Sequence, residues 1–336
     1  MRADVRRQRD VVPAVEADLV EVEEVRILPW LTADGPELAA ERGIELEHDV
    51  PLAPLTTLRV GGPADRLVLA RTREALVKAL RLARAGGVPC FVLGNGSDLV
   101  VADAGIRGLV IRNRARSVSV EGTTLHADGG SAMAMLVKRC TQDGLTGLEF
   151  GISIPGTLGG AVWANAGAHE GEMRDVVTGA EIWDAETDAE RSLRGAECSF
   201  AYRESRFKHS LEIVLAASLG LAAGDPAEIA RRVDEHQAQR RATQPLADQN
   251  AGSVFRNPPG DHAGRLIEAA GLKGFRIGTA SVSTLHANFI VTDRGGRATD
   301  VLALGDHVRD TVAARFGITL AYEIEFVGAW NAGTGR

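Results

Sequence analysis

Two glycine-rich turns carry the residue types best suited to holding a phosphate. Residues 94–98 read Gly-Asn-Gly-Ser-Asp after an apolar run, and residues 155–160 read Pro-Gly-Thr-Leu-Gly-Gly after another. Glycine lets the backbone approach an anion closely, and successive N–H groups in such a turn concentrate positive partial charge. One such turn is more often a tight structural turn than a binding site. Two in one domain predict a pyrophosphate site.

The chain lacks the two common nucleotide-binding fingerprints. No G-x-G-x-x-G follows a predicted strand, and G-x-x-x-x-G-K-[ST] is absent. A Rossmann domain and a P-loop nucleotidase are therefore disfavoured. The three cysteines lie far apart and are odd in number, which argues against both a metal site and a disulfide framework. We predict no bound metal.

Composition narrows the class of partner. The chain has 336 residues, of which 45% are apolar, and a formal net charge of -7. It therefore offers no broad positive field to a nucleic-acid backbone. No apolar run reaches the roughly 18 residues of a membrane helix, and no signal-peptide segment follows the arginine-rich start. We expect a multidomain cytoplasmic protein, with neither nucleic acid nor a membrane as partner.

Apolar periodicity predicts the elements that must position the two turns. Residues 73–85 are expected to form an amphipathic helix, and residues 88–93 a buried strand that runs into the first turn. A second helix is expected between Ser131, as its N-cap, and Gly144, shortly before the second turn. The alternation of strands and helices between residues 55 and 220 suits an α/β or α+β domain.

The two ends of the chain differ from this middle part. Residues 1–46 carry a basic and then an acidic stretch without steady periodicity, which predicts a mobile N-terminal extension. Residues 226–242 are charged and predict a solvated helical connector, with the start of a C-terminal domain just before it. A helix over 299–316 and a final strand over 320–326 complete the predicted elements.

The two turns belong to a longer, ordered series of motifs. Residues 55–64, 93–99, 155–160 and 165–168 closely resemble blocks of the UDP-N-acetylenolpyruvoylglucosamine reductase family. Residues 202–205, 251–258, 271–274, 286–289 and 322–324 resemble that family's remaining blocks, in order. The resemblance implies an α+β fold, with an FAD-binding domain of the vanillyl-alcohol oxidase type over 50–222. This domain has two subdomains, and an α+β substrate-binding domain follows over 223–330.

The same resemblance implies a chemistry. The family reduces the enolpyruvyl ether of a UDP-amino sugar to UDP-N-acetylmuramate for peptidoglycan synthesis, with non-covalent FAD and NADPH as hydride donor. NADPH would visit the same cleft before the sugar, so no separate nicotinamide motif is expected, and we expect a monomer. The cofactor-binding positions implied by the resemblance are Arg59, Gly94, Asn95, Gly96, Ser97, Asp98, Pro155, Gly156, Thr157, Gly159, Gly160 and Ala166.

Three residues match the family's catalytic positions, and their chemistry suits such a reduction. Arg203 can grip a carboxylate with a bidentate fork, and Glu323, if protonated, can donate to a developing enediolate. Ser253 matches the proton donor, although the sequence does not reveal what resupplies its weakly acidic hydroxyl. The expected substrate contacts are Tyr202, Asn257, Lys273, His286 and Asn288.

Three positions depart from the family's usual residues. Asp98 and Thr292 stand where asparagine is common, and Leu285 stands where lysine is common. A pyrophosphate repels a carboxylate, so we expect Asp98 to turn back and cap local N–H groups. These departures leave open a non-catalytic flavin- or sugar-nucleotide-binding protein, and a flavin oxidase of the same fold with another substrate is a further alternative. An oxidase needs a base, whereas the three catalytic candidates form a donor-rich set.

The sequence predicts that FAD is held without a covalent bond, because neither glycine-rich turn contains a His, Cys or Tyr. The purified protein should be yellow, and acid precipitation should release the flavin into the supernatant. Flavin that stays on the thoroughly washed precipitate would contradict this prediction.

Overall fold

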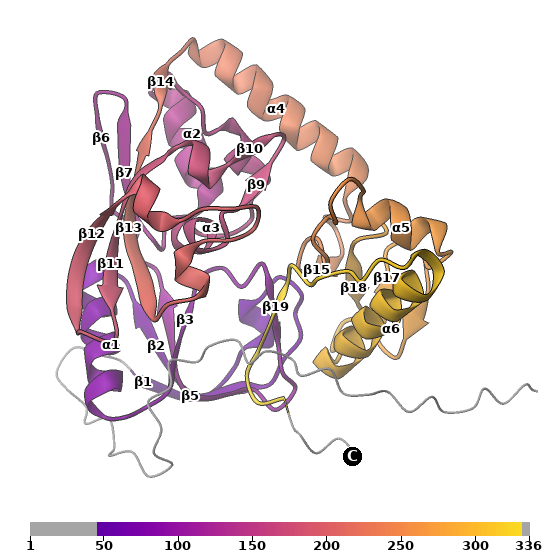
Figure 1. Cartoon of the computed structure of the whole chain (residues 1–336). Helices are drawn as coiled ribbons and strands as arrows, with labels where there is room; N and C mark the ends of the chain where they lie inside the picture. Colours follow the sequence, from indigo (N-terminus) through magenta and orange to yellow (C-terminus); the bar gives the residue numbers. More distant parts are fainter. Residues whose placement is uncertain (1–45, 331–336) are drawn as a thin grey trace, which may run out of the picture.

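The computed structural model describes residues 46–330, so the predicted extension lies outside the described residues except for its last position. Figure 1 shows a sheet-rich body, a long helix that leaves it, and a smaller C-terminal unit beside it. Within residues 46–330, no helix is both long enough and apolar enough to cross a membrane.

The first sheet carries the first glycine-rich turn at its edge. It contains β1 (Leu46–Pro51), β2 (Pro63–Ala70), β5 (Ile106–Asn113) and β3 (Cys90–Leu93), in that spatial order. The last three strands are parallel, so residues 94–98 leave β3 at their common carboxyl end. The predicted helix is confirmed as α1 (Arg73–Ala85), which packs its apolar face on this sheet.

The second sheet is antiparallel and supports the second turn. Its strands, in spatial order, are β12 (Ala189–Arg194), β11 (Val177–Asp184), β13 (Glu212–Gly220), β7 (Thr124–Asp128) and β6 (Val118–Glu121). Two helices, α2 (Met133–Gln142) and α3 (Leu158–Ala164), share its apolar core. The second turn lies directly before and at the start of α3.

The predicted N-cap of α2 is wrong by one residue. The cap is Ala132, and the buried Ser131 hydroxyl has no partner among the described residues. The backbone explains the shift, because the Leu158 N–H donates to the Ser131 carbonyl at 2.8 Å. The start of α2 is therefore fixed by a bridge to the second glycine-rich turn rather than by a side-chain cap.

Short elements complete this half of the chain. Two small ladders pair β8 (Leu145–Thr146) with β14 (Ala222–Ala223) and β9 (Gly167–Ala168) with β10 (Gly171–Glu172). The single 3₁₀ turns are η1 (Ala53–Leu55), η2 (Glu149–Ser153), η3 (Met173–Asp175), η4 (Gly195–Cys198) and η5 (Arg206–Lys208).

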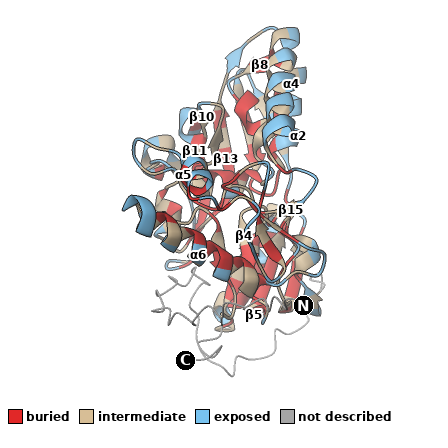
Figure 2. Cartoon of the chain, turned by 90° about the vertical axis from the view of Figure 1, so that its right-hand side faces the viewer, coloured by how far each residue is buried: buried red, intermediate tan, exposed pale blue. Residues whose placement is uncertain are grey.

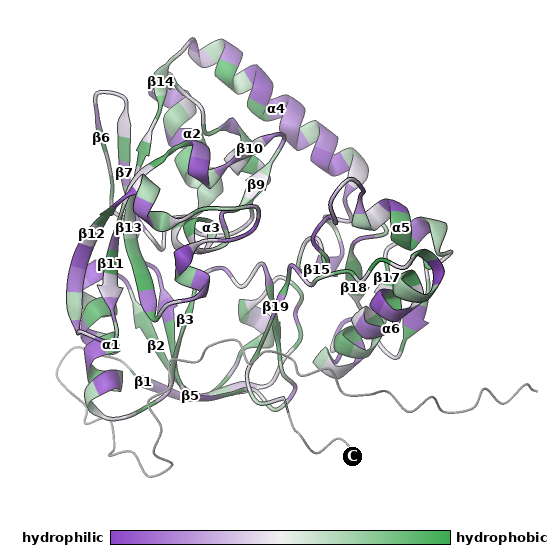
Figure 3. Ribbon diagram, viewed as in Figure 1, coloured by the Kyte–Doolittle hydropathy of each residue, from purple (hydrophilic) through white to green (hydrophobic). Residues whose placement is uncertain are grey.

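The predicted charged connector is confirmed as α4 (Pro226–Thr243). Asp225 caps its first turn by accepting from the Ala227 N–H at 3.0 Å. Figure 2 and Figure 3 show a helix that is largely exposed and hydrophilic along its length. α4 therefore links the two halves without forming a core of its own.

The C-terminal half has its own apolar core, which also includes Leu58, Val60 and Val100 from the first half. Its four-stranded antiparallel sheet contains β15 (Gln249–Asn250), β18 (Ile290–Thr292), β17 (Ala280–Val282) and β16 (Arg276–Ile277), in spatial order. Two helices, α5 (Ala263–Ala269) and α6 (Ala298–Phe316), pack on it. The predicted last helix therefore exists, with one extra residue at its start.

The chain then returns to its first half. β19 (Glu325–Val327) pairs in parallel with β4 (Leu99–Val101), the strand that follows the first glycine-rich turn. The predicted final strand over 320–326 is thus wrong in its extent. Residues 321 to 323 bond instead to the segment 254–256, where the Glu323 N–H donates to the Val254 carbonyl at 2.8 Å. Because residues 321 to 323 pair with that segment, the strand beside β4 begins only at Glu325.

A cap that crosses between the halves should contribute measurable stability. Asp103, after β4, accepts from the Ala298 and Thr299 N–H groups at 2.8 and 3.1 Å, at the start of α6. Asp103→Ala should lower the free energy of unfolding by about 2 kcal/mol, because it removes these two charge-assisted hydrogen bonds and a third from the Thr299 hydroxyl at 2.8 Å. Urea denaturation followed by tryptophan fluorescence measures this. The exposed Asp310→Ala on α6 is the control, and equal unfolding midpoints for both variants would contradict the prediction.

Candidate active site

One large cavity gathers the predicted cofactor and catalytic residues. It has a volume of about 1220 Å³ and is lined by residues of both sheets, α4 and the C-terminal half. All twelve predicted cofactor positions line it, as do Arg203, Ser253 and Glu323. Its volume exceeds the usual range of about 300–1000 Å³ for the site of a single small ligand. It therefore has room for a dinucleotide together with a second molecule.

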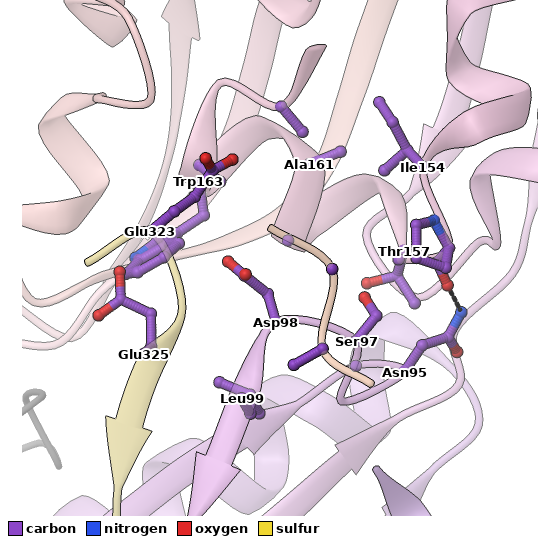
Figure 4. Close-up of a pocket in the computed structure, with 18 of the residues that line it drawn as sticks. Asn95, Ser97, Asp98, Leu99, Ile154, Thr157, Ala161, Trp163, Glu323 and Glu325 are labelled. Atoms are coloured by element: carbon purple, nitrogen blue, oxygen red, sulfur yellow. Dashed lines mark hydrogen bonds between the residues drawn. The ribbon is translucent and has the colours of Figure 1, made fainter. Parts of the chain in front are cut away.

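The two glycine-rich turns are locked to each other at the wall of this cavity. The Asn95 amide donates to the Pro155 carbonyl at 2.9 Å, the dashed line in Figure 4, and accepts from Arg114 at 2.8 Å. A Cβ atom added at Gly94 would lie 2.6 Å from the Thr157 hydroxyl oxygen, so this close approach requires glycine. The sequence prediction that the turns act as a pair agrees with this geometry.

The first turn offers donors that fit the pyrophosphate of FAD. Among residues 46–330, none accepts a hydrogen bond from the backbone N–H groups of Asn95, Gly96 and Ser97. Gly96 has a φ of +61°, and a Cβ atom there would lie 2.7 Å from the Leu55 carbonyl oxygen. A compact turn with successive unpaired N–H groups is the expected cradle of a phosphate.

A strained turn holds Arg203 in place. The backbone of Ala201 and Glu204 exchanges two hydrogen bonds of 3.0 Å, with Tyr202 and Arg203 at the tip. Arg203 has a φ of +56°, which is unfavourable for any residue with a side chain. Its Nε donates to Glu323 Oε1 at 2.5 Å, and its Nη2 donates to the Gly167 carbonyl at 3.0 Å. The fold thus joins two predicted catalytic residues that lie 120 positions apart.

Glu323 and Ser253 are tied together through the backbone. Phe255 bridges Tyr322, and the Tyr322 ring stacks on the Phe255 ring with centroids 4.8 Å apart. The Tyr322 hydroxyl in turn donates to Asp306 on α6 at 3.0 Å. Because Ser253 and Glu323 flank this bridge, the same contacts hold the backbone segments that carry them.

The Asn288 side chain holds the segment around Phe255 in place through two hydrogen bonds. Its amide oxygen accepts from the Phe255 N–H at 3.0 Å, and its amide nitrogen donates to the Phe255 carbonyl at 2.8 Å. Only 4% of the residue is exposed. The sequence suggested a substrate contact at this position, and the structure shows that the amide also braces the segment that carries Ser253.

Two charged residues of the site, Lys208 and Glu325, were not predicted from the sequence. Lys208 donates to Glu325 at 2.8 Å and lies 4.3 Å from the centre of the Trp163 ring. Only 8% of the lysine side chain is exposed. A signal was present for Glu325, because residues i and i+2 of an extended segment face the same side, and Glu323 was already a candidate.

The prediction that Asp98 caps local N–H groups is wrong. Within the described part of the chain its carboxylate accepts no hydrogen bond, while its backbone carbonyl accepts from the Glu325 N–H at 3.0 Å. Figure 4 shows Asp98, Glu323 and Glu325 around the same end of the cavity. The pairing of β4 with β19 places these carboxylates together, so the side chain faces the cavity instead of its own turn.

A second cavity, of about 420 Å³, adjoins the first in the C-terminal half. Four predicted substrate contacts, Asn257, Lys273, His286 and Asn288, line it. Ser253 lines both cavities. The fifth predicted contact, Tyr202, lines neither, and its hydroxyl accepts from the Asn257 N–H at 3.3 Å.

His286 is suited to act as a neutral donor in the second cavity. Burial, together with the charge of Lys273, lowers the pKa of His286 below its ordinary value. Its Nδ1 accepts from the Asn288 N–H at 3.3 Å, which leaves the ring proton on Nε2. Lys273 is paired with Glu268 at 2.8 Å, so it brings a positive charge that is already oriented.

The two remaining departures have different structural settings. Thr292 is buried, and its hydroxyl donates to the Leu58 carbonyl at 2.8 Å, which ties β18 to the segment that carries Arg59. Leu285 is 49% exposed at the second cavity. Thr292 therefore keeps a buried polar contact, whereas Leu285 gives the cavity an apolar rim.

Comparisons with known proteins agree with this geometry. Residues 64–191 match the model of an FAD binding domain, and residues 244–327 match that of the UDP-N-acetylenolpyruvoylglucosamine reductase C-terminal domain. The UDP-N-acetylenolpyruvoylglucosamine reductase 2 of Symbiobacterium thermophilum is 46% identical over 280 residues, covering 83% of this chain and 91% of the relative. The corresponding reductase of Heliobacterium modesticaldum is 47% identical, covering 83% and 89%.

A solved structure shows the same arrangement. The crystal structure of UDP-N-acetylenolpyruvylglucosamine reductase from Thermus caldophilus superposes with a TM-score of 0.73 at 36% identity, covering 84% of this chain and 98% of that one. The predicted fold class, a two-subdomain FAD-binding domain followed by an α+β domain, is confirmed. The fold and the cavity define an FAD-dependent oxidoreductase. The chain belongs to the UDP-N-acetylenolpyruvoylglucosamine reductase family.

The brace at Asn288 should be essential for the local structure. Asn288→Ala leaves the buried Phe255 N–H and carbonyl groups without their partner and should lower the free energy of unfolding by about 2–4 kcal/mol. Urea denaturation measures this, with the exposed Thr284→Ala from the same loop as control. If the two variants unfolded at the same urea concentration, the brace would contribute nothing.

Proposed function

We propose that this protein reduces UDP-N-acetyl-3-O-(1-carboxyvinyl)-glucosamine to UDP-N-acetylmuramate with NADPH as electron donor. The observation that carries the proposal is the position of Ser253, which lines both the large cavity and the smaller cavity of the C-terminal half. A substrate that occupies both would therefore have its reacting group beside this hydroxyl. FAD, when bound, supplies the hydride that adds to the enolpyruvyl group.

Each half of the chain has its own part in this proposal. Residues 50–222 bind FAD through the two glycine-rich turns and the other predicted cofactor positions, and residues 223–330 bind the UDP-amino sugar. In the second cavity, Lys273 and the neutral His286 can both donate hydrogen bonds to phosphate or ribose oxygens. A cytoplasmic location and a monomeric state belong to the same proposal.

Arg203 activates the substrate by binding its carboxylate. An enol ether accepts hydride at its terminal carbon only if the attached carboxylate can take up electron density, and positive charge at that carboxylate makes this possible. The tip of the Ala201–Glu204 turn already aims the guanidinium into the cavity. In this role Arg203 leaves Glu323, which, once it is protonated, can donate a hydrogen bond to the developing enediolate.

Ser253 protonates the neighbouring carbon. Its segment is held by the bridge from Phe255 to Tyr322 and by the Asn288 amide, so the hydroxyl is presented at a fixed place. Hydride addition leaves an enolate that is basic enough to take a proton from a hydroxyl group. Such positioning lowers the reorganisation that the proton transfer requires.

Separate measurement of the two half-reactions distinguishes a proton-donating role of Ser253 from a structural role. Ser253→Ala removes one hydroxyl and should leave FAD content and reduction by NADPH unchanged, because neither needs a proton donor to the sugar. Reoxidation of the reduced flavin by the enolpyruvyl sugar should slow by about 10²- to 10⁴-fold. Anaerobic stopped-flow absorbance follows each half separately. Equal slowing of both halves, or of neither, would remove Ser253 from the proposed role.

A further inference from the structure

The catalytic end of the large cavity has more carboxylates than cationic side chains. Three carboxylates, those of Asp98, Glu323 and Glu325, share it with two cations, those of Arg203 and Lys208. Glu323 is bonded to Arg203 at 2.5 Å and Glu325 to Lys208 at 2.8 Å. Each cation is therefore matched to one carboxylate, and Asp98 is the third.

The backbone of Asp98 is held close to the other charged residues at this end of the cavity. Its backbone is fixed by the pairing of β4 with β19, since its carbonyl accepts from the Glu325 N–H at 3.0 Å. Its side chain is partly buried, faces the cavity, and accepts no hydrogen bond or ion pair from residues 46–330. Like charges that share one end of a cavity are costly when they are partly buried, and a bound proton removes that cost.

The electrostatics agree with this geometry. Burial, and then the charges of Glu323 and Glu325, hold the pKa of Asp98 well above its ordinary value. Lys208 and Arg203 act in the opposite direction and offset only part of the effect. These four residues, from the Arg203 turn, η5 and the returning C-terminal segment, are the charged groups with the largest influence on Asp98.

We propose that Asp98 is a positioning residue that keeps one proton at the catalytic end of the cavity and shares it with Glu323. The inference rests on the proposed function, because it concerns how Glu323 becomes a donor to the substrate. When Arg203 turns to the substrate carboxylate, Glu323 loses its cation and competes for the shared proton. Asp98 thus provides the proton that Glu323 needs before it can donate a hydrogen bond to the substrate.

The step is a simple proton transfer. The O–H bond of the Asp98 carboxyl group breaks, its electron pair stays on Asp98 as a carboxylate, and a new O–H bond forms on a Glu323 carboxylate oxygen. Nothing is oxidised or reduced. The nearby Lys208 stabilises the Asp98 carboxylate that results, which favours the transfer.

Asp98→Asn tests the proposal with little change of shape, because it replaces a carboxyl group by an amide of nearly the same size. In this variant the two cations balance the two remaining carboxylates, so the site no longer needs a proton for neutrality and should lose it at a lower pH. The alkaline limb of the rate of flavin reoxidation by the enolpyruvyl sugar should move down by about 1 pH unit or more, which is about a tenfold lower rate on that limb. Reduction by NADPH should keep its pH profile.

A second readout needs no sugar. The infrared difference spectrum between the unmodified and Asp98→Asn proteins should contain the carbonyl band of a protonated carboxyl group that shifts in D₂O. Asp248→Asn removes an exposed carboxylate from the same cavity and is the matched control for both measurements. This variant should change neither the band nor the pH profile.

The possible outcomes separate the two proposals. Absence of the carboxyl band, or a band without the shift of the alkaline limb, overturns the role of Asp98 even if the sugar is reduced. An equal shift in both half-reactions also overturns it, because it would reflect a general structural effect. If the band is present but the sugar never reoxidises the flavin of the unmodified protein, the proposed function fails while the proton on Asp98 stands.

Discussion

The parallel pairing of β19 with β4 is the contact on which the site depends. It joins the end of the chain to the strand directly after the first glycine-rich turn, more than 220 residues earlier. It sets Glu325 directly beside Leu99, at the end of the cavity that Asp98 and Glu323 also line. Closing so long a loop has an entropic cost, which further contacts between the halves offset. Asp103 caps α6, and Thr292 donates to the Leu58 carbonyl, so the C-terminal half is anchored at several points around the cavity.

Charge balance is the second constraint on this site. Arg203 and Glu323 are paired with each other in the structure, so neither carries an isolated charge in the cavity. In the mechanism that we propose, a substrate carboxylate competes for Arg203, and that competition couples binding to the protonation of the carboxylates nearby. The strained backbone of Arg203 fits this role, because such strain is kept where position matters more than local stability.

The sequence by itself determined the features that depend on local chemistry. Glycine at positions 94 and 96 marked a tight turn, and the periodicity of residues 73–85 and the charged residues of α4 act through neighbours within one or two helical turns. The ordered motifs also indicated the family and the catalytic candidates. The local pattern predicted the N-cap of α2 one residue too early and the start of the last strand too early. Hydrogen bonds to distant backbone segments determine both boundaries.

Only the tertiary structure decided how these residues act together. Ser253 lies between two cavities, Asn288 braces Phe255, and Lys208 reaches Glu325 across 117 positions. The residue at position 98 faces two carboxylates because of the strand that pairs beside it, whereas its own turn suggested a local cap. Periodicity states which face of a strand is buried, but it does not state which distant strand will lie next to it. The charged neighbours of a titratable side chain such as Asp98 are therefore determined only when distant segments of the chain pack together.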